Sequence, residues 1–333
     1  MSHNIAIIGA GGWGTALAHT LAQQGHTVRL WAFEKEVAEG IRLQSENHLF
    51  LPGIRLAQGI EATCDMGEAL SEAEFVVLAM PSHTARGLYT QMLPCLAKSM
   101  VFVSATKGMD TDLLMRMSEV FRSVVGAKFE PRFSALSGPS FAREVAAGSP
   151  TALVAASEDG ETARLVQRTF SAPTLRLYTS SDVVGVELGG AVKNVMAIAA
   201  GVVEGLGLGN NPAAALITRG LAEMTRLAKA AGARAETLSG LAGLGDLVLT
   251  CTGQLSRNRQ VGIELARGRR LEEIVNSMRM VAEGVKTTGA AVRLAAKLGV
   301  EMPVAQQVGR LIRNEISARD AIRELMERSL KEE

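Results

Sequence analysis

A single lysine in the middle of a long apolar stretch is the residue best suited to acid–base chemistry. Residues 185–204 have the pattern of one helix, with Lys193 near its centre. Its neighbours one helical turn away are small or apolar, beginning with Gly189 and Gly190, so no acid can pair with it locally. Burial lowers the pKa of a lysine, and a nearby cation lowers it further. We expect Lys193 to transfer protons while Gly189 and Gly190 leave room for a ligand; a buried structural lysine is the alternative.

Polar or small residues follow three apolar runs that are typical of buried strands. Ser82 follows the first run, Lys107 the second, and Gly138 and Ser140 the third. In open α/β sheets, ligands bind outside the carboxyl ends of the strands. We therefore expect these four residues near a binding cleft, where Lys107 would hold an anionic substrate or act as the cation near Lys193. A lysine in a solvated loop is the alternative interpretation of Lys107.

Two polar clusters stand out in the second half of the chain. Asp246 and Thr250 are four residues apart and share one helix face. Ser256 is suited to cap the helix that follows it, and Arg257 can grip a phosphate with two parallel hydrogen bonds. Free N–H groups at that helix start would add to phosphate binding. The alternatives are a structural Asp–Thr pair and a capped surface helix.

A glycine pattern near the N-terminus predicts dinucleotide binding. Gly9, Gly11 and Gly14 form a G-x-G-x-x-G that directly follows the apolar run at 5–8. A helical pattern and a second strand pattern at 27–31 come next, which is the context that the motif requires. The glycines permit a tight turn and a close approach of the backbone to a pyrophosphate at the helix N-terminus.

The residues after the second strand pattern bear on the choice of cofactor. Glu34 stands twenty positions after Gly14, where an acid can bind a ribose 2′-hydroxyl. A solvated charge is the alternative interpretation of Glu34. No arginine follows this strand to meet a 2′-phosphate, so the loop favours NAD over NADP.

The order of these patterns predicts an α/β domain followed by an all-α domain. Strand patterns alternate with helices as far as residue 181, as in an open, doubly wound parallel sheet. From residue 182 only helical patterns remain, and without a flexible linker we expect domains 1–181 and 182–333 to share an interface. The expected strands are 5–8, 27–31, 75–80, 101–104, 133–137, 151–156 and 175–178, and the expected helices of the second domain lie near 185–204, 212–231, 258–267, 283–298, 304–314 and 318–329.

Composition excludes several other classes of protein. The net charge is +1 and aromatic residues make up 4% of the chain, which argues against a nucleic-acid partner. Three scattered cysteines form no metal spacing, and zinc, Walker and nucleophile-elbow motifs are absent. No leader pattern and no apolar run of spanning length occurs, so we expect a cytoplasmic protein without membrane insertion. Among the histidines, we expect His19 and His26 at the surface, and His83 follows a strand end near the predicted cleft.

Taken together, several segments resemble bacterial-type NAD(P)-dependent glycerol-3-phosphate dehydrogenases, and the likeness extends along almost the whole chain. The resemblance implies a Rossmann domain, an all-helical substrate domain and reversible reduction of dihydroxyacetone phosphate to sn-glycerol 3-phosphate for glycerophospholipid synthesis. We also expect that the chain can form a homodimer. The segments are Gly-Ala-Gly-Gly-Trp-Gly at 9–14, Ala-Thr-Lys-Gly at 105–108, Ser-Gly-Pro-Ser at 137–140, Gly-Gly-Ala-Val-Lys-Asn at 189–194, Leu-Ile-Thr-Arg-Gly-Leu-Ala-Glu-Met at 216–224, Gly-Leu-Gly-Asp-Leu-Val-Leu-Thr-Cys-Thr at 243–252 and Ser-Arg-Asn-Arg at 256–259.

The resemblance also implies roles for individual residues. Lys193 would be the proton donor and acceptor, with Thr250 and Asn194 orienting the polar network around it. The substrate site would be lined by Lys107, Gly138, Ser140, Lys193, Asp246, Ser256, Arg257 and Asn258. The cofactor would contact Gly9, Gly11, Gly12, Trp13, Gly14, Phe33, Glu34, Phe50, Lys107, Ala142, Arg257, Val281 and Glu283.

Two positions depart from the family pattern, and two rival functions stay open. Phe33 stands where relatives often carry His or Arg near the adenosine ribose, which bears on NADP preference. Gly12 stands where many relatives have serine. The rivals are a related dehydrogenase for a hydroxy acid or an imine, and a nucleotide-sensing protein that binds the cofactor without turnover.

Overall fold

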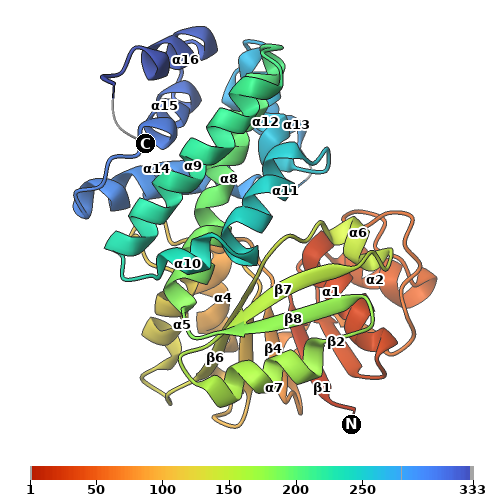
Figure 1. The fold of residues 1–333 in the computed structure, drawn as a ribbon. Helices are drawn as coiled ribbons and strands as arrows, with labels where there is room; N and C mark the ends of the chain where they lie inside the picture. Colours follow the sequence, from red (N-terminus) through yellow and green to blue (C-terminus); the bar gives the residue numbers. More distant parts are fainter. Residues whose placement is uncertain (1, 279, 331–333) are drawn as a thin grey trace.

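The computed structural model describes residues 2–278 and 280–330. In this part of the chain a sheet domain is followed by a helical domain (Figure 1). The strands are β1 Asn4–Ile8, β2 Thr27–Trp31, β3 Ile60–Thr63, β4 Phe75–Leu78, β5 Val101–Ser104, β6 Arg132–Ser137, β7 Thr151–Ala156 and β8 Leu175–Ser180. The helices among them are α1 Gly12–Gln23, α2 Lys35–Gln44, α3 Met66–Leu70, α4 Ala85–Met92, α5 Met117–Val125, α6 Ala142–Ala146 and α7 Gly160–Phe170.

The remaining elements are all helical. They are α8 Val183–Gly205, α9 Asn210–Ala230, α10 Ala235–Leu238, a π-helical turn η3 Leu241–Gly245, α11 Asp246–Thr252, α12 Arg257–Ala266, α13 Leu271–Ser277, α14 Glu283–Lys297, α15 Pro303–Ile312 and α16 Ala318–Met326. The predicted fold class, a doubly wound α/β sheet followed by an all-α domain, is confirmed.

The strand order places the carboxyl ends of the central parallel strands at one edge of the sheet. The order is β3-β2-β1-β4-β5-β6-β7-β8, so the chain runs outward from β1 in one direction and then outward from β4 in the other. Neighbouring strands are parallel except β6 and β7. The switch between β1 and β4 is where such sheets bind ligands.

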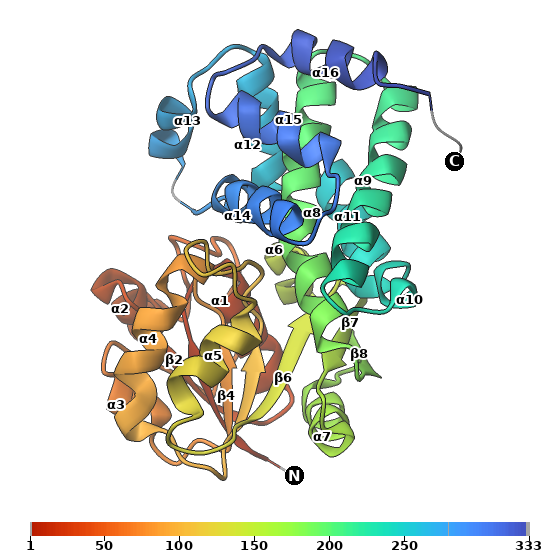
Figure 2. The same cartoon turned by 90° about the vertical axis from the view of Figure 1, so that its left-hand side faces the viewer.

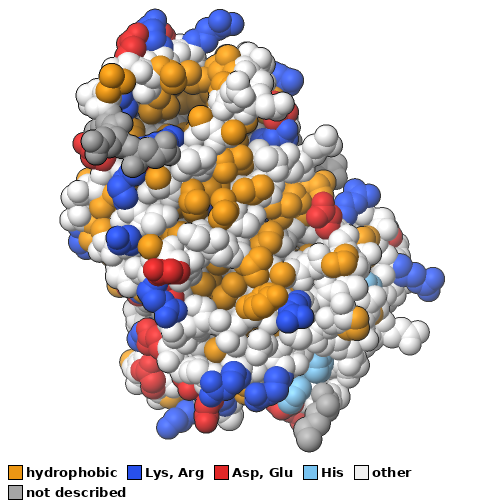
Figure 3. Space-filling view, viewed as in Figure 1, with side chains coloured by type: hydrophobic (Ala, Val, Ile, Leu, Met, Phe, Trp, Pro, Cys, Tyr) orange, Lys and Arg blue, Asp and Glu red, His pale blue; other side chains and the backbone are white. Residues whose placement is uncertain are grey.

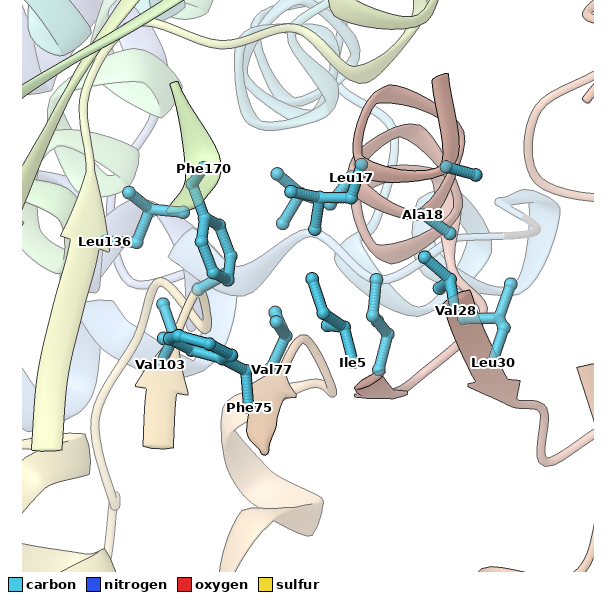
Figure 4. Close-up of a cluster of buried hydrophobic side chains, with 14 of the residues drawn as sticks. Ile5, Leu17, Ala18, Val28, Leu30, Phe75, Val77, Val103, Leu136 and Phe170 are labelled. Atoms are coloured by element: carbon cyan, nitrogen blue, oxygen red, sulfur yellow. The ribbon is translucent and has the colours of Figure 1, made fainter. Parts of the chain in front are cut away.

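Helices cover both faces of the sheet because the central strands are apolar on both sides. Every residue of β4 and β5 is buried. On one face Leu17 of α1 and Phe170 of α7 pack against Phe75 and Val77 (Figure 4). On the other face α4 and α5 contribute Tyr89 and other buried side chains. Such burial on both faces explains the continuous apolar runs of the central strands.

Helix α8 is the core of the helical domain. It begins beside the sheet and runs through the middle of the helical layer, with α9, α12 and α14 around it (Figure 2). By length and composition α8 could cross a membrane, but 89% of its apolar window is buried inside the protein. Its apolar character is therefore explained by its place in the core.

Some elements and residues differ from the sequence prediction. Strand β3 and helix α13 were not predicted, since each buries only one residue, Ala62 or Ile274, and so lacks a strong apolar pattern. The expected surface position of His19 and His26 is wrong, because both are buried. The ring of His19 accepts a hydrogen bond from the Ala57 N–H, and that of His26 accepts one from the His3 N–H.

Candidate active site

Two lysines share one buried carboxylate where the two domains meet. Lys193 Nζ lies 2.5 Å from Asp246 Oδ1, and Lys107 Nζ lies 2.8 Å from Asp246 Oδ2. Lys193 also donates to Thr250 Oγ1 at 2.7 Å, and this hydroxyl donates to the Asp246 carbonyl at 2.6 Å. The lysine without a local partner therefore finds its partner 53 residues further along the chain, on α11.

Glycines allow α8 to bring Lys193 against the sheet. The Asp182 carboxylate caps the start of α8 by accepting from the Gly185 N–H at 2.8 Å. A Cβ at Gly189 would lie 2.5 Å from the Ala242 carbonyl oxygen, and one at Gly190 would lie 2.6 Å from Ser137 Oγ. The expectation that these glycines leave room for a ligand is wrong. The space beside them is filled by η3 and by the end of β6.

The strand ends contribute Lys107 and the turn after β6. Lys107 Nζ donates to the Gly138 carbonyl at 2.7 Å and to Ser140 Oγ at 3.2 Å. Gly138 has φ +135°, a conformation that side chains rarely adopt, so glycine is required where the carbonyl turns toward Lys107. Ser82, the fourth strand-end candidate, donates to Glu283 and lies against Gly108, the residue after Lys107, because a Cβ on Gly108 would lie 2.5 Å from Ser82 Oγ. His83 beside it is exposed.

Burial tunes the acidity of Lys193. The pKa of Lys193 is lowered to about 8, chiefly because burial penalises the ammonium form. Asp246 opposes this shift, and the charge of Lys107 reinforces it. A lysine with such a pKa can both give and take a proton near neutral pH.

An asparagine pair connects the lysine site to the starts of two more helices. Asn258 Nδ2 donates to Asn194 Oδ1 at 2.9 Å, and the Gly284 N–H donates to Asn258 Oδ1 at 2.9 Å. Asn194 directly follows Lys193, so the first turns of α12 and α14 lie beside the lysine turn of α8. Ser256 caps α12 by accepting from the Arg259 N–H at 3.2 Å. The two predicted polar clusters, Asp246 with Thr250 and residues 256–259, therefore lie around the same turn of α8, at Lys193 and Asn194.

Arg257 and Glu283 are the first residues of α12 and α14, directly before Asn258 and Gly284 of the asparagine network. Arg257 is exposed, and its Nη1 donates to the Val281 carbonyl at 2.7 Å. The Glu283 carboxylate accepts from the Ser82 N–H at 2.8 Å and from Ser82 Oγ at 2.6 Å. This contact joins the helical domain to the end of β4.

The three motif glycines fit a dinucleotide pyrophosphate. Gly9 has φ +116°, and a Cβ there would lie 2.7 Å from the Ala79 carbonyl oxygen. A Cβ on Gly14 would lie 1.9 Å from the Gly9 carbonyl oxygen, so this position permits the close packing of α1. Gly11 faces open space, because a Cβ there would have no atom of the described residues within 4 Å. Its backbone can therefore receive a ligand at the N-terminus of α1.

Other predicted cofactor residues border the same turn. A Cβ at Gly12 would lie 2.9 Å from the Phe50 carbonyl oxygen and 3.7 Å from Ala142 Cβ. Trp13 and Ala142 pack against the same buried cluster of Ala16, Leu51 and Ala146. At the end of β2, Phe33 is 78% exposed and lies edge-on to Trp31, and Glu34 directly precedes α2.

Asn47 holds this loop in place and was missed by sequence analysis. It is fully buried, and its Nδ2 donates to the Ala10 carbonyl and to Thr15 Oγ1, both at 2.8 Å. Its Oδ1 accepts from the Phe50 N–H at 3.0 Å. The sequence offered little sign of this role, because an asparagine in a polar loop is typical of a solvated turn.

The fold and the site define a nicotinamide-nucleotide-dependent oxidoreductase, with a glycine turn for the dinucleotide and a tuned lysine beside the strand ends. The family model for the N-terminus of NAD-dependent glycerol-3-phosphate dehydrogenase matches residues 4–163, and that for its C-terminus matches residues 182–323. The chain belongs to the NAD-dependent glycerol-3-phosphate dehydrogenase family.

Individual relatives agree with this assignment over nearly the whole chain. The glycerol-3-phosphate dehydrogenase [NAD(P)+] of Koribacter versatilis is 58% identical over 97% of each chain. That of Geobacter sulfurreducens is 54% identical, covering 100% of this chain and 99% of its own. The crystal structure of glycerol-3-phosphate dehydrogenase from Coxiella burnetii superposes with a TM-score of 0.94 at 39% identity, covering 98% of this chain and 99% of that one.

Proposed function

We propose that this chain catalyses the reversible NAD(P)-dependent reduction of dihydroxyacetone phosphate to sn-glycerol 3-phosphate. The observation that carries the proposal is the pair Lys107 and Lys193 on Asp246, at the strand ends and beside the start of α12. The names of the relatives support the choice of substrate. The product would supply the backbone of glycerophospholipids.

Lys193 acts as the general acid of ketone reduction and the general base of alcohol oxidation. Reducing the ketone adds a hydride to carbon and a proton to oxygen, and a bound reduced nicotinamide supplies the hydride. Lys193 in its ammonium form gives the proton, and the neutral amine that remains keeps its contacts to Asp246 and Thr250. The ammonium of Lys107 stabilises negative charge developing on the oxygen.

The groups around the lysines bind and orient the substrate. Lys107, Gly138, Ser140, Asp246 and Asn258 border the reacting end, with Asn194 and Thr250 fixing polar side chains there. Arg257 and the N-terminus of α12, capped by Ser256, bind the phosphate, because guanidinium groups and helix starts both favour anions.

The glycine turn and its surroundings hold the dinucleotide. Gly9, Gly11 and Gly14 receive the pyrophosphate, bordered by Gly12, Trp13, Phe50 and Ala142. The residues near the nicotinamide end of the dinucleotide would be Lys107, Arg257, Val281 and Glu283. Those near its adenosine end would be Phe33 and Glu34. The exposed Phe33 offers no charge to a 2′-phosphate, and Glu34 would repel one, which favours NAD.

The proposal extends to the domains, the assembly and the location of the protein. The sheet domain comprises residues 1–181 and binds the cofactor, and the helical domain comprises residues 182–333 and binds the substrate. We also propose that the protein forms a homodimer and that it is located in the cytoplasm. Apolar side chains gathered over the middle of one face support self-association (Figure 3), which light scattering measures directly.

Steady-state kinetics with dihydroxyacetone phosphate test the function. NADH and NADPH are used in parallel, with a hydroxy acid, its oxo acid and an imine as competing substrates. We expect turnover of dihydroxyacetone phosphate and a higher kcat/KM with NADH. In Phe33→Arg, kcat/KM with NADPH rises about tenfold, since a charged hydrogen bond contributes about 1.5–3 kcal/mol. Cofactor binding without turnover of any of these compounds would reject the enzyme, and turnover of another one alone would reject the substrate.

A further inference from the structure

Two segments of the chain are connected to each other twice. One segment runs from Lys107 at the end of β5 to the start of α5, and the other is α8. The first connection is the carboxylate of Asp246 between Lys107 and Lys193. The second joins Glu187 of α8 to the start of α5.

The carboxylate of Glu187 is buried and fully engaged. The side chain is 6% exposed. Its Oε2 accepts from Arg116 Nη1 at 2.9 Å and from Ser118 Oγ at 2.5 Å. Its Oε1 accepts from the Ser118 N–H at 2.7 Å. Burying a carboxylate is costly unless such partners surround it, so this contact specifies one arrangement of α8 on α5.

Because Glu187 is bound to the start of α5, it fixes both the position of α8 along its own axis and the rotation of α8 about that axis. Glu187 lies six positions before Lys193, which is about 9 Å along the helix axis and about 240° around it. The two side chains therefore reach different neighbours, Glu187 toward α5 and Lys193 toward α11. A shift or rotation of α8 that freed Glu187 would move the Lys193 ammonium relative to Lys107.

We propose that Glu187 is a positioning residue, which clamps α8 to the start of α5 and so holds Lys193 opposite Lys107 on the Asp246 carboxylate. The inference rests on the proposed function, because it concerns the lysine that transfers the proton. Glu187 touches neither substrate nor cofactor. It acts through Arg116 and Ser118.

Whether loosening the clamp raises or lowers the pKa of Lys193 depends on which of its neighbours belong to the other domain. Lys193, Asp246, Thr250 and Cys251 all belong to the helical domain, and Lys107 belongs to the sheet domain. Loosening the clamp withdraws Lys107 and admits water, while the contacts of Lys193 to Asp246 and Thr250 persist. Both the repulsion from Lys107 and the burial decrease, so the pKa of Lys193 rises.

The test compares Glu187→Gln and Ser118→Ala with the control Glu204→Gln. Glu204 also lies on α8, but it pairs with Arg259 inside the helical domain. The pKa of Lys193 is measured from the pH dependence of its reductive methylation by formaldehyde with cyanoborohydride as the reductant, followed by peptide mass spectrometry. We expect a higher pKa in Glu187→Gln and Ser118→Ala, and no change in Glu204→Gln. kcat falls about tenfold or more in Glu187→Gln, since displacements near 1 Å cost about 100-fold.

The outcomes separate the clamp from a merely structural role and from the proposed function. The Kd for NADH changes far less than kcat in Glu187→Gln, because the glycine turn that holds the pyrophosphate lies in the sheet domain. A lower unfolding midpoint with an unchanged Lys193 pKa and kcat would overturn the proposal, as would an equal shift in Glu204→Gln. If the unmutated chain does not turn over dihydroxyacetone phosphate, the function fails, while the methylation measurement still decides the clamp.

Discussion

At the scale of single residues, the proposed chemistry depends on the balance of charges around Lys193. Burial lowers its pKa, Asp246 raises it, and Lys107 lowers it again. A fully paired surface lysine would stay protonated and could not act as a base near neutral pH. Sharing one carboxylate between two ammonium groups keeps both lysines in place without fully stabilising either charge.

The pKa of Lys193, about 8, predicts opposite pH dependences for the two directions of reaction. Ketone reduction needs the ammonium, so kcat/KM for dihydroxyacetone phosphate falls as pH rises through about 8. Alcohol oxidation needs the neutral amine, so kcat/KM for glycerol 3-phosphate rises over the same range. Both profiles are measured from pH 6 to 10, with Lys229→Ala as an exposed-lysine control. Parallel profiles in the two directions would contradict the role of Lys193.

Sequence analysis identified Lys193 and Lys107 because both stand out locally. One is a lone cation in an apolar helix, and the other ends a buried strand. Glu187 and Asn47 could not be identified in this way. Each has the appearance of a solvated residue until the fold brings it against Arg116 or against the glycine turn.

At the scale of elements, α8 and α12 cross with their backbones in close contact. A Cβ at Gly201 would lie 1.9 Å from the Arg259 carbonyl oxygen, and a Cβ at Gly262 would lie 1.9 Å from the Ile198 carbonyl oxygen. The two backbones meet through their glycines. This crossing places the first turn of α12, with Arg257 and Asn258, beside Asn194.

Gly201→Ala is expected to destabilise the protein, because the backbone of α12 must move to admit the methyl group. Overpacking of this kind costs about 1–3 kcal/mol, and the blocking atom is backbone. The free energy of unfolding is measured by denaturant titration. Gly289→Ala is the matched control, since α14 leaves open space there and helix propensity favours alanine by about 1 kcal/mol. Equal stability of the two variants would show that the crossing can relax.

Sequence patterns predicted the central strands and α8, which bury many residues, and missed β3 and α13, which bury few. The central strands and α8 were found because their apolar runs are continuous. β3 and α13 were missed because a single buried residue gives no periodicity. The place of η3 under Gly189 could not be predicted either, because it depends on how closely α8 approaches the turn.

At the scale of the whole molecule, the site exists only where the two domains meet. The sheet domain contributes Lys107 and Gly138, and the helical domain contributes Lys193 and Asp246. Two carboxylates of the helical domain bind groups of the sheet domain: Glu187 binds the start of α5, and Glu283 binds Ser82. These contacts hold the two domains in this arrangement. In the proposed function, substrate and cofactor meet beside Lys193.

The turnover of Lys193→Met with dihydroxyacetone phosphate and NADH tests the central claim most directly. Methionine is also unbranched and apolar, with a side chain one atom shorter than that of lysine, but it has no proton to give. The Kd for NADH and the unfolding midpoint serve as controls for binding and folding, together with Lys229→Met at the surface. The account predicts that kcat falls by about 10²–10⁴-fold while NADH binding is retained. A kcat close to that of the unmutated protein would contradict it.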